Sequence, residues 1–581
     1  MESAYPDFLL EREESHNIAA NVVEISLDCL QKETEIATGD PTLCKECSSL
    51  LNSFSQLEKQ DSDYLWVCEF CGTQNLLDLE EGEIPSNPEV TYIFGPVREV
   101  EETKQRRDDA ASVVFCVDIS GSMCITKPVQ GNLNLKTTKK PELADFIDPG
   151  DEDQRIPGEN RDVTYISRLD CVQGAIESQL KELKEVAPNK RVGLVTFSGD
   201  VKVIGDGSFP EVNIAGDRLN QTEAIKKVMD GYRLQSKIED NSEYLIQKVV
   251  GLEEGGPTAL GPGLYASLIL ASQGAPGSKV IICTDGIANI GVGNLEDEDN
   301  EEFYEEVGVL ATELGVKISV ISMEGEESRL EALSPITEQT GGDVIKVAPE
   351  KISEEFANIL ADEVIATHVK ATVTLHKALK FYLEEEEDLV FNGSRLVKFL
   401  GNATPSSLFS FQYGIKTRAE LQAQQTNSEE LKQVPLQAVL EYQSMQGMKC
   451  LRVVSKVQKV SFDKSSRRAR ADIMARAGTH QASKMVQKGR FQDARKVCAA
   501  WEQEMGSCAQ NTMDLAHIQA YSEFSNQLQQ GIDDQECLEM QAGLVVDESS
   551  KDPEERKKMS KARKKLYTDN LTKVSRKKSK K

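Results

Sequence analysis

Residues 113–122 read Val-Val-Phe-Cys-Val-Asp-Ile-Ser-Gly-Ser. The first five are apolar, which predicts a strand buried on both faces, as in a parallel sheet covered by helices. The polar half then places Asp118, Ser120 and Ser122 on one tight turn at the carboxyl end of that strand. Open α/β sheets bind ligands at this edge. Three hard oxygen donors suit Mg²⁺ or Mn²⁺ and leave room in the coordination shell for water or a partner's carboxylate.

Two later segments supply further oxygen donors. Residues 255–261, Gly-Gly-Pro-Thr-Ala-Leu-Gly, offer the hydroxyl of Thr258 on a glycine-rich turn, and residues 280–286, Val-Ile-Ile-Cys-Thr-Asp-Gly, form a second apolar strand that ends at Asp285. In order and context these segments resemble the metal-ion-dependent adhesion site of von Willebrand factor A domains. The resemblance implies one magnesium or manganese ion surrounded by Asp118, Ser120, Ser122, Thr258 and Asp285. The alternatives are an A domain without a metal, or turn residues that only cap helices.

Strand-like and helix-like segments alternate over residues 108–366, which predicts a Rossmann-like A domain with a parallel sheet covered on both faces. The expected strands are 113–117, 191–197, 279–283, 317–322 and 343–347, and the expected helices are 164–185, 221–230, 241–252, 262–272, 300–314 and 349–366. A polar insertion over residues 126–162 is expected to be a loop near the metal. It could gate the cation, contact a partner or be passive.

Four of the 13 cysteines form two Cys-x-x-Cys pairs, Cys44 with Cys47 and Cys68 with Cys71, with twenty residues between the pairs. This spacing is typical of structural zinc, because each pair aims two thiolates at one ion. Four sulfurs complete a tetrahedron and leave no position for a substrate. The sequence therefore predicts a structural zinc ribbon over residues 36–80. The alternative is two unrelated cysteine pairs in a reducing compartment.

A ribbon followed by an A-type domain resembles the inner-shell subunits of the coat protein complex II (COPII) vesicle coat, in which a β-sandwich, a helical domain and a gelsolin-like module follow. Residues 90–94 predict a strand that links the ribbon to the A domain. Period-two alternation over 368–462 predicts the sandwich, to which residues 1–35 could contribute, and helical spacing over 465–530 predicts the helical domain. Residues 531–581 are expected to be a disordered tail, too short for a gelsolin-like module. The predicted fold class is thus multidomain, α/β plus β.

Two features depart from the coat subunits and from a related group. The A-type domain of the coat subunits usually lacks the full metal-binding set, which this chain keeps. The related circularly permuted Ras proteins join similar ribbon and A domains to a GTPase. No Gly-x-x-x-x-Gly-Lys-Ser/Thr phosphate loop occurs in this sequence, so it holds no GTPase of that type.

Composition and charge narrow the function classes. The 581 residues are 39% hydrophobic, enough for several cores, and neither a membrane-spanning apolar run nor a signal peptide is found, so an intracellular soluble protein is expected. The net charge is −29, yet residues 551–581 carry 14 Lys or Arg against four Asp or Glu. The acidic body disfavours nucleic acid. The basic tail from residue 551 could be a nuclear-import signal, a contact with anionic membrane or a solvated end.

The leading hypothesis is a non-enzymatic scaffold of vesicle-coat type, cytoplasmic or peripheral at the endoplasmic reticulum membrane, with the nucleus less favoured. Its metal would take an Asp or Glu of a protein partner, such as a coat component or a small GTPase. One alternative is an adaptor in ubiquitin or nuclear pathways that binds through exposed ribbon residues Glu69, Phe70 and Gln74. Another is a magnesium-dependent hydrolase at Asp118 and Asp285. None of the five histidines lies near the metal motif in sequence, which argues against an enzyme.

Overall fold

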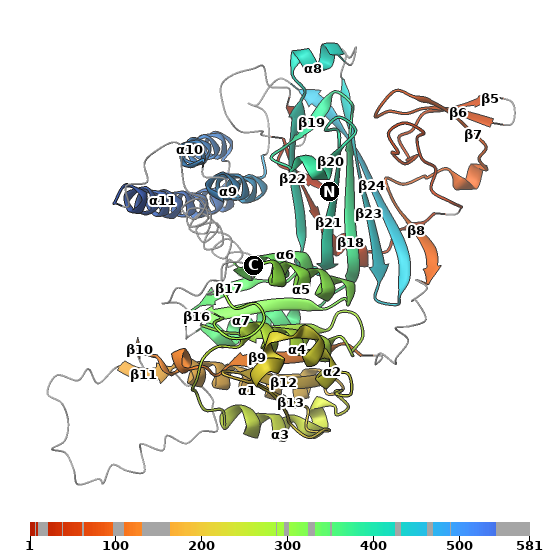
Figure 1. Ribbon diagram of the computed structural model, residues 1–581. Helices are drawn as coiled ribbons and strands as arrows, with labels where there is room; N and C mark the ends of the chain where they lie inside the picture. The colour runs from red at the N-terminus through yellow and green to blue at the C-terminus, as the bar shows by residue number, and fades with distance from the viewer. Residues whose placement is uncertain are drawn as a thin grey trace, which may run out of the picture. The chain divides into compact units, whose positions relative to one another are not determined.

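The computed structural model describes residues 1–5, 7–9, 21–37, 39–60, 63–96, 110–130, 163–285, 288–295, 301–323, 332–348, 351–423, 432–461, 469–487, 490–509 and 511–541 (Figure 1). The chain forms two compact units. Residues 99–364 form the central unit, and residues 1–98 together with 365–581 form the composite unit. Within the described ranges, no helix combines the length and the apolar character needed to cross a membrane.

A seven-stranded sheet runs through the central unit. Its order is β14 (Val212–Ile214), β13 (Val201–Gly205), β12 (Arg191–Phe197), β9 (Ser112–Asp118), β15 (Lys279–Cys283), β16 (Lys317–Met323) and β17 (Val344–Val347). β9 lies in the middle and pairs in parallel with β12 and β15, so all seven of its residues are buried. The five expected strands are confirmed. β13 and β14, which run antiparallel at one end of the sheet, were not predicted.

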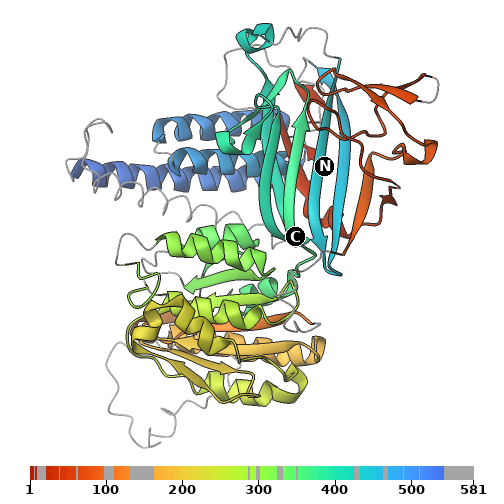
Figure 2. The same ribbon diagram turned by 45° about the vertical axis from the view of Figure 1, so that its right-hand side comes forward.

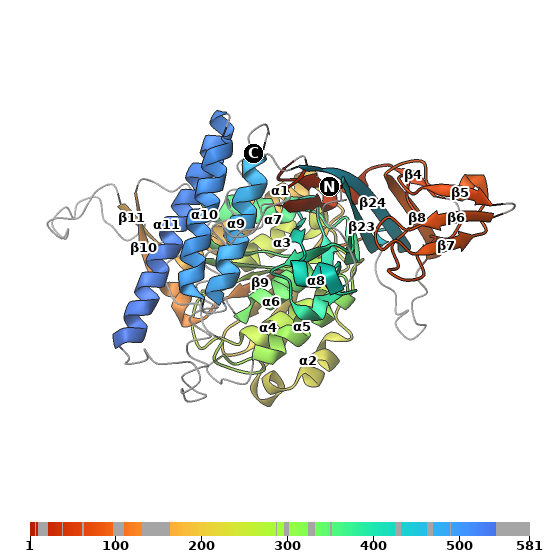
Figure 3. The same ribbon diagram turned by 90° about the horizontal axis from the view of Figure 1, so that it is seen from above.

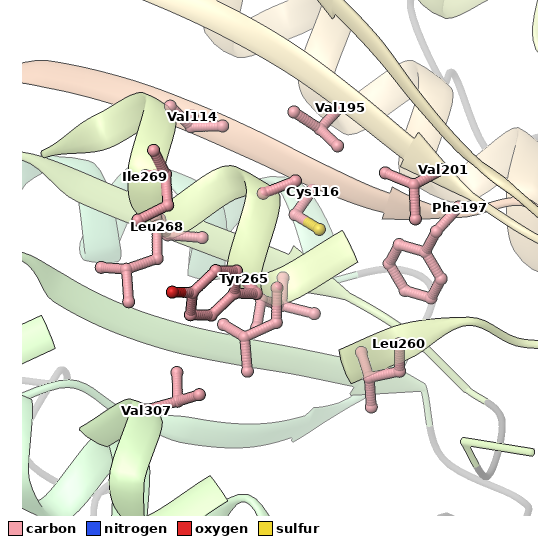
Figure 4. Close-up of a cluster of buried hydrophobic side chains, with 14 of the residues drawn as sticks. Val114, Cys116, Val195, Phe197, Val201, Leu260, Tyr265, Leu268, Ile269 and Val307 are labelled. Atoms are coloured by element: carbon pink, nitrogen blue, oxygen red, sulfur yellow. The ribbon is translucent and has the colours of Figure 1, made fainter. Parts of the chain in front are cut away.

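Helices cover both faces of this sheet. They are α1 (Arg168–Val186), α2 (Thr222–Met229), α3 (Ile238–Val250), α4 (Leu260–Ala271), α5 (Glu301–Glu313), α6 (Ser334–Thr340) and α7 (Ile352–Ala361), with the 3-10 turns η4 (Gly121–Cys124) and η7 (Gly216–Asn220). Alternate residues of β9 enter two cores: Val114 and Cys116 pack with α4 (Figure 4), whereas Phe115 and Val117 pack with α1. α4 is apolar on all sides and every residue in it is buried, as expected for a helix enclosed by its neighbours.

The segment expected to be a loop from residue 126 contains a strand. β10 (Thr126–Gln130) pairs antiparallel with β11 (Val163–Ser167), with Thr126 opposite Ser167. The loop prediction was therefore wrong for residues 126–130. Their mixed polar sequence lacks an apolar period, and their pairing partner lies more than thirty residues along the chain. Residues 131–162, the rest of the insertion, lie outside the described residues.

Two sheets form a β-sandwich in the composite unit (Figure 2). The larger has the order β20 (Leu389–Val390), β21 (Arg395–Ala403), β18 (Ala366–Leu375), β23 (Gln433–Ser444), β24 (Met448–Ser461), β8 (Glu89–Pro96) and β4 (Glu35–Ile36), with β2 (Phe8–Leu9) beside β24. The smaller has the order β1 (Glu2–Ser3), β3 (Val22–Ser26), β22 (Leu408–Ile415) and β19 (Leu379–Tyr382). Ile25, Val373 and Leu436 belong to their shared core.

β8 confirms the strand expected at residues 90–94. The structure adds that this strand pairs along β24 as part of the sandwich. Val90 and Tyr92 are buried there against Val439 and Val453, so apolar packing fixes the strand in the sheet. The N-terminal segment also joins the sandwich, because β3 pairs with β22 and β4 pairs with β8.

Three helices, α9 (Ala471–Gln487), α10 (Phe491–Cys508) and α11 (Thr512–Gln541), lie side by side (Figure 3). Their core includes Met474 and Trp501 together with Tyr5 from the N-terminal segment. α11 continues to residue 541, so the expectation of a disordered tail was wrong for residues 531–541. Ile532 is fully buried in the helical core, which extends the helix beyond the expected boundary. Residues 542–581, including the basic part of the tail, lie outside the described residues.

The ribbon is a small antiparallel sheet of β5 (Leu57–Gln60), β6 (Asp63–Val67) and β7 (Gln74–Leu77). Its own core contains Trp66 and Phe70 beside the cysteines. The remaining short elements of the composite unit are α8 (Arg418–Ala423), η1 (Leu27–Gln31), η2 (Glu81–Glu83) and η10 (Glu386–Asp388).

Candidate metal centres

The turn after β9 holds the first three predicted oxygen donors. Asp118 is the last residue of β9 and is fully buried, and its Oδ1 accepts a hydrogen bond from the backbone N–H of Ser120 at 2.8 Å. η4 follows at once, and Ser120 Oγ lies 3.0 Å from Ser122 Oγ. The tight turn therefore brings one carboxylate and two hydroxyls to the carboxyl edge of the sheet.

Asp285 reaches the same edge from the neighbouring strand. It follows β15, which runs parallel to β9, so the two strands end side by side. Ser122 Oγ donates to Asp285 Oδ1 at 2.7 Å. Thr284, a residue that sequence reasoning missed, donates from Oγ1 to Asp118 Oδ2 at 2.6 Å. Hydrogen bonds thus connect Ser122 with both Ser120 and Asp285, next to Asp118. We call these four predicted residues, with Thr258, the oxygen cluster.

Thr258 is placed by its backbone. Gly121 donates its N–H to the carbonyl of Gly256 at 2.9 Å, which holds the 255–258 turn against the turn after β9. Gly256 has φ of +87°, a conformation that favours glycine. The Thr258 N–H donates to Asn289 Oδ1 at 2.7 Å. The described hydrogen bonds of the cluster do not include its hydroxyl, so Thr258 is brought near through the adjoining loop.

An arginine that was not predicted from the sequence also lies at this edge of the sheet, paired with Asp285. Arg168 is the first residue of α1, and its N–H donates to the carbonyl of Ile125 at 3.2 Å, at the base of the β10–β11 hairpin. Its Nη1 forms an ion pair with Asp285 Oδ2. Both side chains are almost fully buried, at 2% and 1% exposure. Removing one partner of such a buried ion pair is strongly destabilising, because the other charge stays buried without compensation.

Burial makes the ionisation of Asp118 depend on the charges beside it. Burial raises the pKa of Asp118 to about 6, and the charge of Asp285 acts in the same direction, against hydrogen bonds from Ser120 and Thr284 that lower it. A nearby divalent ion would reverse this penalty, because it stabilises the ionised carboxylate. The donors are carboxylates and hydroxyls, which are the ligands that Mg²⁺ and Mn²⁺ prefer. The chemistry of the donor set therefore fits the implied metal.

The four predicted cysteines converge in the ribbon. Their Sγ atoms all lie within 4.8 Å of one another. The Sγ–Sγ distance is 3.6 Å both between Cys44 and Cys71 and between Cys47 and Cys68. A tetrahedral zinc with bonds of about 2.3 Å would place its sulfurs about 3.8 Å apart, so the donor set fits zinc. Within the described part of the chain, this is the one group of three or more His, Cys, Asp or Glu side chains arranged for a metal.

Each cysteine pair sits in a turn closed by backbone hydrogen bonds. Ser48 N–H donates to the carbonyl of Cys44 at 3.0 Å, and Gly72 N–H donates to the carbonyl of Cys68 at 2.8 Å. The buried amide of Asn75 donates to Cys44 Sγ at 3.6 Å. A hydrogen bond with Cys47 and burial raise the pKa of the Cys68 thiol, so a bound cation is needed to keep that sulfur as thiolate.

The ribbon residues expected to be exposed are not all exposed. Phe70 is 1% exposed and packs in the ribbon core, so that expectation was wrong. Glu69 is partly buried, and its carboxylate accepts hydrogen bonds from Trp66 Nε1 at 3.0 Å and Ser55 Oγ at 2.9 Å. Gln74 is exposed.

The sequence was compared with known protein families and proteins. No protein-family model matches the sequence. The chain is 31% identical over 494 residues to circularly permutated Ras protein 1 of Dictyostelium discoideum, and the match covers 83% of this chain and 56% of that protein. The chain thus spans little more than half the length of this relative.

Two solved structures are similar to this chain. The human COPII-coat protein Sec24c matches with a TM-score of 0.51 at 12% identity, covering 87% of this chain and 69% of that chain. A von Willebrand factor type A protein from Catenulispora acidiphila matches with a TM-score of 0.39 at 12% identity, covering 72% and 82%. The expected multidomain fold is therefore confirmed: this chain has the fold of the Sec24c coat protein and is similar in sequence to a circularly permutated Ras protein.

Proposed function

We propose that this protein is a non-enzymatic scaffold that binds acidic groups of protein partners through a divalent cation held by the oxygen cluster. The observation that carries the proposal is the chain of hydrogen bonds from Ser120 through Ser122 to Asp285, beside the buried Asp118. These groups lie at the sheet edge where α/β folds bind ligands. A carboxylate of the partner would complete the coordination of the cation, which makes the contact strong and geometrically selective.

The cysteine cluster has a structural role in this proposal, with zinc bound by all four thiolates. Contacts with the sandwich support this role. Arg395 Nη1 donates to the carbonyl of Cys47 at 3.1 Å, and Lys377 N–H donates to the carbonyl of Phe70 at 2.9 Å. Both carbonyls belong to the knuckles, so the folded ribbon supports one side of the sandwich.

The comparisons suggest two kinds of partner. The name of Sec24c refers to the COPII coat, which supports a coat component as partner and a role in transport from the endoplasmic reticulum to the Golgi. The name of the Dictyostelium relative refers to Ras, which supports a small GTPase as partner. We place the protein in the cytoplasm, with a peripheral position at the endoplasmic reticulum membrane.

The test is capture of purified coat components and Ras-class GTPases by the zinc-loaded chain, with and without magnesium. Removing magnesium by dialysis, without a strong chelator, leaves zinc in place. Capture should require magnesium and should be lost in Asp118→Ala, but it should persist in Asp217→Ala, which changes an exposed acid of the same unit. Equal capture without magnesium, or by Asp118→Ala, would contradict the proposal.

A specific observation favours the ribbon as a second binding surface. Val67 and Leu76 are 46% and 52% exposed, and the register places them diagonally on one face of β6 and β7. Leu43 and Phe54 are also exposed, at 53% and 45%. This second candidate function is an adaptor that binds an apolar partner surface. Val67→Glu with Leu76→Glu should abolish partner capture in that case, whereas Asp118→Ala should not.

The hydrolase alternative has less support. Both carboxylate oxygens of Asp118 accept hydrogen bonds, one from Ser120 and one from Thr284, which makes Asp118 a poor candidate for the general base that a hydrolase needs. Incubation with nucleotides and phosphoesters tests this alternative. Turnover above the level of Asp118→Ala would favour the hydrolase over the scaffold.

A further inference from the structure

Arg168 places a permanent positive charge inside the oxygen cluster. Its guanidinium pairs with Asp285 Oδ2, while Asp285 Oδ1 accepts from Ser122. The ion pair is almost fully buried, so water does not screen it as it would a surface pair. An arginine stays protonated at any physiological pH, so this charge is constant.

The backbone of Arg168 is held beside the oxygen cluster by its neighbours. Arg168 follows Ser167, which caps α1 through a reciprocal hydrogen-bond pattern with Asp170. The N–H of Arg168 bonds to Ile125, which directly follows η4 of the oxygen-cluster turn. The helix start and the metal turn are therefore connected, and this connection fixes the backbone of Arg168 beside the oxygen cluster.

Arg168 changes the net charge of the metal-loaded site. Asp118 and Asp285 contribute −2 when ionised, and Arg168 reduces this to −1. A divalent cation then gives a loaded site of +1, which a single partner carboxylate neutralises. Without Arg168 the loaded site would be neutral, and a partner carboxylate would make it −1.

We infer that Arg168 is the residue that makes the loaded site select an acidic partner, at the expense of its affinity for the metal alone. The inference rests on the proposed function and extends it. Arg168 is a positioning and charge-setting residue, because it acts through Asp285. Two consequences follow: the free chain binds the divalent ion weakly, and a carboxylate strengthens metal binding because it neutralises the remaining charge.

The test uses the zinc-loaded full chain and Mn²⁺, whose binding is followed by electron paramagnetic resonance. Arg168→Gln removes the charge but can still donate a hydrogen bond to Asp285, and Arg168→Lys keeps the charge. Arg168→Gln should bind Mn²⁺ at least about tenfold more tightly, because a unit charge close to a divalent ion is removed from a buried site. Arg168→Lys should stay within about threefold of the unaltered chain.

A second measurement needs no variant and does not depend on Arg168→Gln folding. Acetate, the simplest carboxylate, should tighten Mn²⁺ binding to the unaltered chain, and Arg168→Gln should show a smaller effect. Sodium chloride at equal ionic strength is the control for screening. No effect of acetate on the unaltered chain would overturn the inference, as would unchanged or weaker Mn²⁺ binding in a folded Arg168→Gln.

The outcomes separate this inference from the proposed function. If the unaltered chain binds Mn²⁺ and Arg168→Gln gains nothing, only the inference fails. If Arg168→Gln binds Mn²⁺ and the unaltered chain does not, Arg168 has replaced the metal, and both the inference and the metal-dependent scaffold fail. If neither binds, both fail.

Discussion

The cysteine cluster and the oxygen cluster bring their donors together in opposite ways. All four sulfurs come from residues 44–71 and are positioned by local turns such as the one closed by Ser48 and Cys44. The oxygen donors come from residues 118–285 and meet because β9 and β15 run in parallel and end together. The first arrangement is closed and saturated with soft ligands, which suits a structural ion. The second lies at an open sheet edge with hard ligands, which suits a partner.

The largest expected effect is loss of zinc from the ribbon. Cys68→Ser should remove one ligand and unfold β5–β7, because metal binding supplies folding free energy on the order of 10 kcal/mol in small zinc domains. Hydrogen exchange of the ribbon amides and zinc content measure this. Cys29→Ser, outside the cluster, should change neither. If the ribbon amides stay protected in Cys68→Ser, the ribbon does not depend on zinc for its fold, and the contrast between the two clusters fails.

A backbone change should affect the oxygen cluster alone. Gly256→Ala forces a side chain onto a residue with φ of +87° and should cost about 1–2 kcal/mol. It should also weaken Mn²⁺ binding several-fold, since the Gly256 carbonyl accepts the Gly121 N–H. Gly255→Ala is the matched control, because its φ is not positive and a Cβ there would meet no atom within 4 Å. Equal effects of the two substitutions would contradict the role given to this turn.

A lower pH should destabilise the composite unit through His480, with a smaller effect than the substitutions above. Burial, followed by Lys484 and Lys398, lowers the pKa of His480 to about 3, against an ordinary value of 6.5. The folded protein keeps this ring neutral. The contribution of the ring to the free energy of unfolding is therefore full above pH 6.5 and falls as the pH drops from 6.5 toward 3. Because the ring is partly exposed, we expect a loss of about 1 kcal/mol at pH 5.

The measurement is urea unfolding of the full chain at pH 7 and pH 5, with hydrogen exchange to separate the units. His480→Gln should remove this part of the acid sensitivity from the helical core. The central unit contains no histidine, so histidine protonation cannot destabilise it. A loss at pH 5 that is the same in His480→Gln would mean that other groups cause it.

Sequence reasoning succeeded where the signal was local. The apolar runs at 113–117 and 279–283 are the strands that end at Asp118 and Asp285, and the Cys-x-x-Cys pairs converge as their spacing predicts. It failed where contacts cross long stretches of chain. Arg168 follows a long insertion, and nothing near it in sequence points to Asp285.

Tertiary packing also determines three features that the sequence pattern does not predict. Thr284 looks like the end of an apolar strand, but its hydroxyl bonds to Asp118 because parallel strands place them together. Phe70 was expected on the ribbon surface and lies in its core. α11 extends past the expected boundary because Ile532 packs among the other helices.

The central claim is that the oxygen cluster binds a divalent cation, and Mn²⁺ binding to the zinc-loaded chain tests it most directly. The account predicts one Mn²⁺ per chain beyond the zinc, displaced by Mg²⁺, and lost in both Asp118→Ala and Ser120→Ala while the fold and zinc content stay unchanged. No Mn²⁺ binding by the unaltered chain, or equal binding by Asp118→Ala, would contradict it.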